Sequence, residues 1–96
     1  MKNYEIMFIV RPTLGEDEIK KVAKDFSEVI TKNGAKVKEE QALGQKELAY
    51  EIKDFKSGYY FLLEVEAEDD KAIREFDRLA LISNDIVRHL ITKVED

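Results

Sequence analysis

The sequence predicts an α+β fold in which a four-stranded antiparallel sheet carries two helices on one face. Two segments have apolar residues at helical spacing, four segments are rich in β-branched and aromatic residues, and glycines or the single proline fall near the breaks between them. The resulting order is β-α-β-β-α-β. The length of 96 residues suits one domain, spanning residues 1–96, with one hydrophobic core.

The first strand is expected over residues 4–11, where apolar side chains fall on both faces. Pro12 ends it. Thr13 followed by Glu16 is a capping-box pattern, which predicts that the first helix begins there. The dipeptide Asn33-Gly34 is typical of a helix end with left-handed backbone. Between them runs an apolar stripe at helical spacing, made of Ile19, Val22, Ala23, Phe26, Val29 and Ile30.

The middle of the chain predicts two more strands. Residues 35–41 alternate and are strongly charged, which is typical of an edge strand. Gly44 is expected to bend this strand or to mark a bulge, and residues 48–52 continue it. Residues 53–58 are expected to form a turn, and residues 59–67 form the third strand.

The second helix is predicted after Asp69 or Asp70, because either side chain can cap it. Residues 83–85 break the helical pattern, and residues 86–94 form the last strand. The stripe of this helix consists of Ala72, Ile73, Phe76, Leu79 and Ala80.

This element order is the split β-α-β, or ferredoxin-like, plan. Right-handed crossovers place the first and third strands in the middle of the sheet. Both helical stripes then need the same sheet face, which leaves the other face open. That face still carries apolar side chains, so it is a candidate interaction surface. The alternative is a scatter of exposed apolar residues of the kind that most protein surfaces have.

Composition limits the chemistry. Charged residues make up 39% of the chain, yet its net charge is −5, which argues against strong RNA binding without a basic edge or a basic partner. The chain has no cysteine and only one histidine, His89, so we expect no metal site, no catalytic triad and no cofactor. It shows no secretory signal and no apolar run long enough for a membrane span, so we expect a cytoplasmic protein.

The third strand invites comparison with an RNA-recognition strand motif. Gly58, Tyr59 and Phe61 fit the start of that motif, which stacks bases on its aromatic residues. Tyr60 then replaces a small residue, and Glu64 stands where an aromatic ring is needed. We therefore interpret the aromatic residues as core or interface residues rather than as base-stacking ones.

Four stretches of the sequence resemble the bacterial small-subunit ribosomal protein six family. Residues 4–12 resemble its Tyr-Glu-Ile opening, which ends in proline, and residues 34–35 resemble its Gly-Ala entry into the second strand. Residues 44–50 look like its G-x-R-x-L-A-Y segment. Residues 75–80 together with 82–89 resemble its second helix and fourth strand. These stretches extend over nearly the whole chain.

The resemblance implies a structural component of the small ribosomal subunit and no enzymatic activity. Such proteins bind the central domain of the small-subunit ribosomal RNA as a heterodimer with small-subunit ribosomal protein eighteen, which is basic. The resemblance implies no membrane and no small-molecule substrate. Our candidate RNA-binding residues are Lys2, Arg11, Lys46, Lys53, Lys56 and Arg88. Our candidate partner-binding residues are Leu48, Tyr50, Tyr59, Phe61 and His89.

The sequence departs from the family pattern in one loop and one helix. The family usually has two adjacent basic residues before L-A-Y, whereas this chain has Gln45, Lys46 and Glu47. Lysine cannot form the bidentate fork of arginine on phosphate, so this loop is a weaker RNA anchor or the contact has moved. Leu81 stands where many relatives carry a basic residue.

Two other functions have the same topology. An acylphosphatase-like enzyme needs a glycine-rich phosphate cradle with an arginine after the first strand. Arg11 and Gly15 are present, but Pro12 removes an amide donor and there is no second glycine. A ferredoxin-like regulatory or dimerisation domain that pairs through its open sheet is the other alternative.

Overall fold

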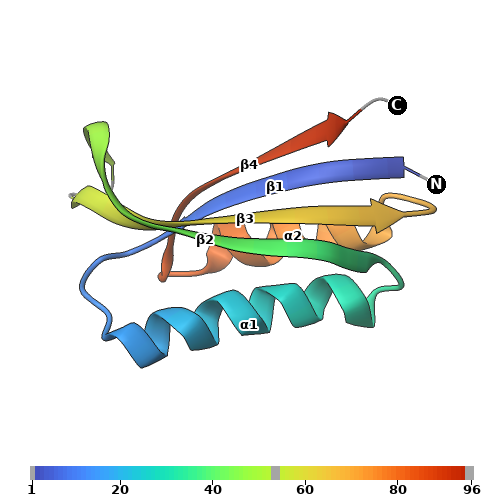
Figure 1. Cartoon of the computed structure of the whole chain (residues 1–96), viewed down its shortest axis with the longest axis horizontal. Helices are drawn as coiled ribbons and strands as arrows, with labels where there is room; N and C mark the ends of the chain where they lie inside the picture. The colour runs from blue at the N-terminus through green and yellow to red at the C-terminus, as the bar shows by residue number, and fades with distance from the viewer. Residues whose placement is uncertain (1, 53–54, 95–96) are drawn as a thin grey trace.

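The predicted topology is confirmed in a computed structural model, which describes residues 2–52 and 55–94 (Figure 1). These residues form one antiparallel sheet in the order β2-β3-β1-β4, with two helices, in a ferredoxin-like fold. As expected, the first and third strands are central. The elements are β1 (Lys2–Val10), α1 (Glu16–Lys32), β2 (Lys36–Ile52), β3 (Phe55–Ala67), α2 (Lys71–Ile82) and β4 (Ile86–Val94).

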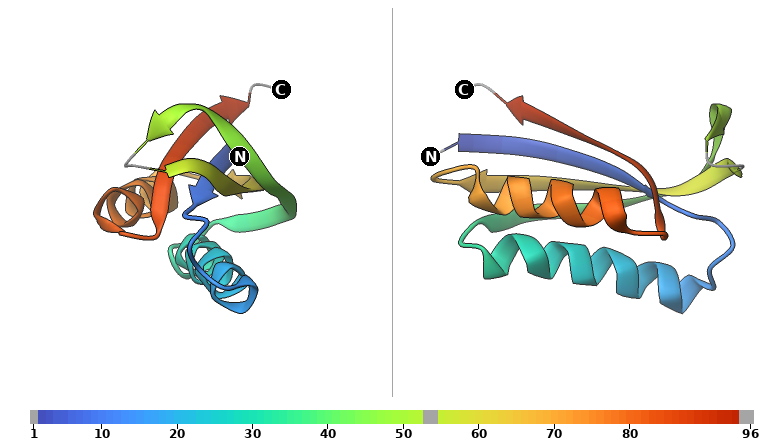
Figure 2. Two further views of the ribbon diagram at one scale, coloured as in Figure 1. Left: turned by 90° about the vertical axis from the view of Figure 1, so that its left-hand side faces the viewer. Right: turned by 180° about the vertical axis from the view of Figure 1, so that it is seen from behind.

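Both helices pack on the same face of the sheet, which we call the covered face (Figure 2). The ring of Phe8 in β1 lies at the centre of the core between sheet and helices, and it is fully buried. Its centroid is 5.3 Å from Phe61 of β3, 6.0 Å from Phe26 of α1 and 5.7 Å from Phe76 of α2. One aromatic cluster therefore joins the sheet to both helices.

The start of α1 differs from the prediction. The helix begins at Glu16, and Gly15 is its extended N-cap residue without a side-chain cap. The prediction of a capping box at Thr13 is wrong, because the Thr13 hydroxyl accepts a hydrogen bond from the Arg11 side chain instead. The other end agrees with the prediction, since Gly34 has a φ of 91°, in the left-handed region.

At the start of α2, both candidate capping aspartates have a role. Asp70 occupies the N-cap position, although its side chain makes no capping bond, and its Oδ2 is 2.9 Å from Nε of Arg74. The Asp69 carboxylate accepts a hydrogen bond from the backbone N–H of Lys71 at 3.1 Å. The side chain that satisfies a helix N–H is therefore that of Asp69.

The β2–β3 hairpin is longer than predicted. Residues 55–58 belong to β3 rather than to a turn, so the hairpin extends past β1 and curls away from the helices (Figures 1 and 2). Gly44 has a φ of 91° and lies at a register shift between β2 and β3, which confirms the predicted bulge. Such bulges increase the local twist of a strand.

Candidate protein and RNA interface

The sheet face opposite the helices, which we call the open face, is organised in rows of residues that face one another across the strands. Residues paired in an antiparallel register lie on the same face. Met7 of β1 pairs with Leu62 of β3 and with Leu90 of β4. We call these three residues the apolar row. Leu90 is 55% exposed, while Met7 and Leu62 are half-buried.

A second row lies next to it and carries negative charge. Glu5 of β1 pairs with Glu64 of β3, and Glu64 pairs in turn with Glu39 of β2. We call these three carboxylates the acidic row. On the β4 side the row ends at Thr92, which pairs with Glu5.

Positive charge gathers at the other side of the apolar row, toward the hairpin. Arg88 of β4 is exposed and pairs with Ile9, which in turn pairs with Tyr60 of β3. Lys46 of β2 pairs with Gly58, and its Nζ lies 5.7 Å from the centroid of the Tyr60 ring. The open face is therefore acidic at one end, apolar in the middle and basic at the hairpin end.

The predicted RNA-binding residues do not form one patch. Lys46 of β2 and Lys56 of β3 are exposed on the hairpin, and Arg88 is exposed on β4 opposite Ile9. Lys2 is exposed at the opposite end, where β1 begins. Lys53 lies outside the described residues.

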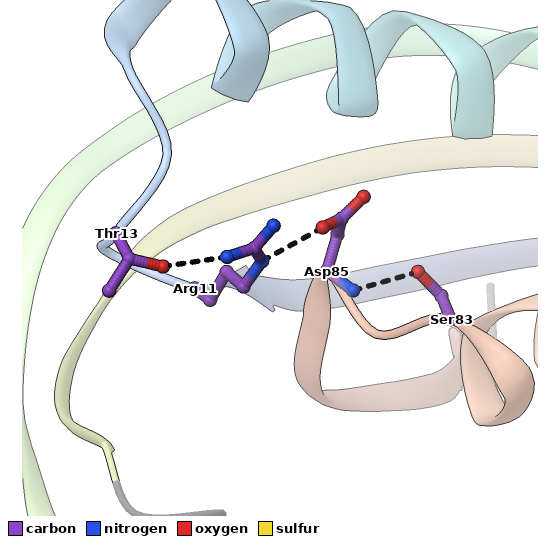
Figure 3. Close-up of polar contacts among 4 residues, drawn as sticks. All are labelled: Arg11, Thr13, Ser83 and Asp85. Carbon is purple, nitrogen blue, oxygen red and sulfur yellow. Dashed lines mark hydrogen bonds and ion pairs between the residues drawn. The ribbon is translucent and has the colours of Figure 1, made fainter.

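Arg11 forms a clasp between two loops rather than a free cationic surface (Figure 3). Its Nε donates to Oδ1 of Asp85 at 2.8 Å, and its Nη1 donates to the Thr13 hydroxyl at 2.8 Å. The backbone N–H of Arg11 also donates to the Asp85 carbonyl at 2.9 Å. Asp85 is itself held by a 3.1 Å bond from its N–H to the Ser83 hydroxyl. The loop after β1 is thereby tied to the loop before β4, and this Arg is not arranged as part of a phosphate cradle.

Two of the predicted partner-binding residues are largely buried. Phe61 is only 4% exposed and stacks on Phe8, so its ring belongs to the core. His89 pairs with Phe8 in the register and its side chain is 12% exposed. Its Nε2 lies 2.6 Å from Oδ1 of Asp77, and its ring lies 6.1 Å from that of Phe76. Both side chains therefore lie on the covered face, and His89 fastens β4 to α2.

The other predicted partner-binding residues lie elsewhere. Tyr59 is half-buried at the end of the covered face, with its ring 5.0 Å from that of Phe61. Leu48 is half-buried in the hairpin, and the side chain of Tyr50 lies outside the described residues. The sequence analysis missed Met7 and Leu62, which could have been identified because they lie two positions from Glu5 and Glu64 and so share a strand face with them. Leu81 and the next residue, Ile82, are 68% and 67% exposed at the end of α2.

Two charged residues of α2 have shifted pKa values. The pKa of Glu75 is lowered, chiefly by a hydrogen bond from Arg78, and the pKa of Arg78 is raised by the same bond. Both residues are exposed on α2 and form an ordinary helical ion pair. Among residues 2–52 and 55–94, no group of three or more carboxylate or histidine side chains is placed to hold a metal ion. Neither described helix has the length and apolar character that a membrane crossing requires.

Comparison with known proteins agrees with this geometry. The family model described as Ribosomal protein S6 matches residues 3–93. The solved structure of 30S ribosomal protein S6 from Thermotoga maritima is similar at a TM-score of 0.92 and 23% identity, covering 97% of this chain and 87% of that one. A protein from Arabidopsis thaliana is similar at a TM-score of 0.58 and 11% identity, covering 100% and 95% of the two chains.

At these identities the two structures establish the shared fold, and the family assignment rests on the model match, which spans nearly the whole chain. The four stretches that resemble the family in the sequence all lie within that match. This chain belongs to the ribosomal protein S6 family, a family of proteins of the small ribosomal subunit.

Proposed function

We propose that this chain binds the central domain of the small-subunit ribosomal RNA as a heterodimer with small-subunit ribosomal protein eighteen. The observation that carries the proposal is the family match over residues 3–93. The role is structural rather than enzymatic, and the chain contributes surfaces instead of reacting groups. The net charge of −5 supports a shared task, because a basic companion offsets the repulsion between an acidic protein and phosphate.

RNA contact is proposed at the hairpin end of the sheet. Lys46 and Arg88 lie on the basic side of the open face, and Lys56 is exposed on the same hairpin. The hairpin extends past β1, so Lys46 and Lys56 can approach an RNA backbone without bringing the acidic row close to it (Figure 1). Arg11 contributes less, because the clasp with Asp85 and Thr13 already uses two of its guanidinium nitrogens.

A gel-shift titration with the central-domain RNA tests the proposal. The chain is titrated alone, then together with ribosomal protein eighteen from the same organism, and an unrelated RNA of equal length serves as the control. We expect little binding by the chain alone and clear, selective binding by the pair. Strong and salt-sensitive binding by the chain alone would contradict partner dependence, and no selective binding by the pair would refute the proposed function.

A further inference from the structure

We propose that the dipeptide Asn33-Gly34 is a site of spontaneous deamidation, and that the folded end of α1 keeps it unreactive until that end opens. The chain has three asparagines, Asn3, Asn33 and Asn84, and Asn33 is the one that a glycine follows. This modification is independent of the heterodimer proposed above, because it needs only water and the chain itself.

The reaction joins a backbone nitrogen to a side-chain amide. The Gly34 nitrogen gives its proton to hydroxide and attacks Cγ of Asn33, so that an N–Cγ bond forms. The bond between Cγ and Nδ2 then breaks, and Nδ2 takes a proton from water and leaves as ammonia. Water adds to one of the two carbonyl carbons of the resulting cyclic imide and opens the ring, which leaves aspartate or isoaspartate. Because glycine has no Cβ, the attacking nitrogen at position 34 is not shielded by a side chain.

The attacking nitrogen is held by the hydrogen bonds that end α1. The N–H of Gly34 donates to the carbonyl of Thr31 at 3.2 Å, and the N–H of Ala35 donates to the carbonyl of Ile30 at 3.2 Å. These two bonds form a Schellman motif, in which Gly34 is the left-handed residue with a φ of 91°. Ile30 and Ala35 are both buried, so an apolar contact accompanies the motif.

The conformation of Asn33 also opposes ring closure. The imide ring can close only when Cβ of Asn33 and the Gly34 nitrogen are nearly eclipsed about the Cα–C bond. With a ψ of 18°, the backbone nitrogen of Asn33 is instead nearly eclipsed with that of Gly34, and the tetrahedral Cα directs Cβ away. The side-chain Nδ2 donates to the Val29 carbonyl at 2.7 Å, which fixes the amide on the helix. The reaction therefore requires a rotation that breaks the last turn of α1.

The helix end is accessible to water and can open without global unfolding. Gly34 is exposed and Asn33 is half-buried. Opening of a single terminal turn costs less free energy than unfolding of the whole chain, so the reactive conformation is reached from the native state. The left-handed backbone that ends α1 favours glycine at position 34. The residue that suits this helix end is therefore the same one that makes Asn33 reactive.

The product cannot rebuild the helix end. A carboxylate has no proton to donate to the Val29 carbonyl, so two acceptor oxygens would replace the present 2.7 Å hydrogen bond. The new negative charge also lies at the C-terminus of α1, where the helix dipole is unfavourable to it. Isoaspartate in addition lengthens the main chain before Gly34. Deamidation therefore makes the opening of the helix end permanent.

The first test compares the folded chain with the unfolded chain. The full chain is incubated in buffer and in concentrated urea, at neutral and at mildly alkaline pH, and peptide mapping by mass spectrometry measures aspartate and isoaspartate at position 33. We expect deamidation of Asn33 to be at least about tenfold slower in the folded chain. It should be faster at the higher pH, because the attacking nitrogen must lose a proton, and faster in urea than at Asn84. Equal rates in both states, or no reaction of Asn33 in urea, would overturn the inference.

A matched pair of variants distinguishes local opening from general instability. Ile30→Val loosens the apolar contact at the end of α1, and Ile19→Val makes the same chemical change near the start of the same helix. We expect Ile30→Val to accelerate deamidation of the folded chain at least about threefold and Ile19→Val to change it less than about twofold. Equal acceleration by both variants would mean that the reaction proceeds from the globally unfolded chain, and it would contradict opening of the helix end.

Two substitutions of Asn33 test the effect of the product. Asn33→Asp has the structure of one product, whereas Asn33→Ser removes the amide without adding charge and cannot form the imide. We expect Asn33→Asp to have a lower urea unfolding midpoint than both the wild type and Asn33→Ser, because the added charge meets the helix dipole and the Val29 carbonyl. An unfolding midpoint of Asn33→Asp equal to that of the wild type would overturn the conclusion that deamidation holds the helix end open.

Discussion

Gly58 and Ile9 touch across the open face so closely that a β-carbon at position 58 would lie 2.2 Å from Cγ2 of Ile9 and 3.4 Å from the carbonyl oxygen of Val10. Ile9 is only 5% exposed and has little room to move. We expect Gly58→Ala to lower the free energy of unfolding by about 1–3 kcal/mol, the usual cost of overpacking. Urea denaturation measures this change.

The neighbour itself provides the control for this prediction. Ile9→Ala removes the Cγ2 atom that a β-carbon at position 58 would contact. Gly58→Ala should therefore lower the free energy of unfolding by less in an Ile9→Ala background than in the wild type. An equal cost in both backgrounds would show that contact with Ile9 is not the reason for glycine at this position.

The aromatic cluster in the core should dominate the stability of the chain. Phe8→Ala removes the ring that contacts both helices and β3, and we expect it to lower the free energy of unfolding by about 3–5 kcal/mol. Leu81→Ala also shortens a large apolar side chain, but at a position 68% exposed, so we expect a change within about 0.5 kcal/mol. Similar losses of unfolding free energy in the two variants, measured by thermal or urea unfolding, would contradict this account.

The clasp between the two loops should make a small but specific contribution. Arg11→Gln, Asp85→Asn and the double variant form a double-mutant cycle, whose coupling energy we expect to be about 0.5–1 kcal/mol. The value is modest because the side chains are 32% and 37% exposed, so water screens their attraction. A coupling energy near zero in urea denaturation would mean that the 2.8 Å contact does not stabilise the fold.

Lys46 should contribute to RNA binding more than a lysine on α1 does. We expect Lys46→Ala to weaken binding of central-domain RNA by the heterodimer and to reduce the salt slope by about 1, as for loss of one phosphate contact. Lys20→Ala is the control, because Lys20 lies on α1 at 3.5 Å from Glu16 and away from the hairpin. Filter binding over a range of salt concentrations measures this slope. Equal salt slopes of RNA affinity for the two variants would contradict the proposed RNA site.

Much of the fold could be predicted from the sequence because two periodicities are clear in it. The buried residues of α1 are Ile19, Ala23, Phe26 and Ile30, all members of the predicted stripe, and α2 agrees in the same way. The ends of the elements were harder to predict. Thr13 matched a capping pattern, but tertiary contact with Arg11 uses its hydroxyl, and this contact depends on a loop far along the chain.

The candidate site was only partly predictable, because β1 and β3 have apolar residues on both faces. A hydrophobic pattern alone could not tell that Phe61 faces the core while Leu62 faces outward. The carboxylate residues of these strands distinguish the two faces. Glu5 and Glu64 are poor candidates for burial, so their alternation identifies the outward positions of both strands, and Met7 and Leu62 follow from it. In β4, Arg88 marks the outward side in the same way and leaves His89 facing the helices.

The position of β1 has a consequence for synthesis of the chain. One edge of this strand pairs with β3 and the other with β4, whose Val94 faces Asn3 near the opposite end of the sequence. While the polypeptide is still being made, β1 therefore has an unpaired edge until β4 has emerged. Such an edge can pair with a neighbouring nascent chain, so slow translation of the final segment should promote aggregation of this protein.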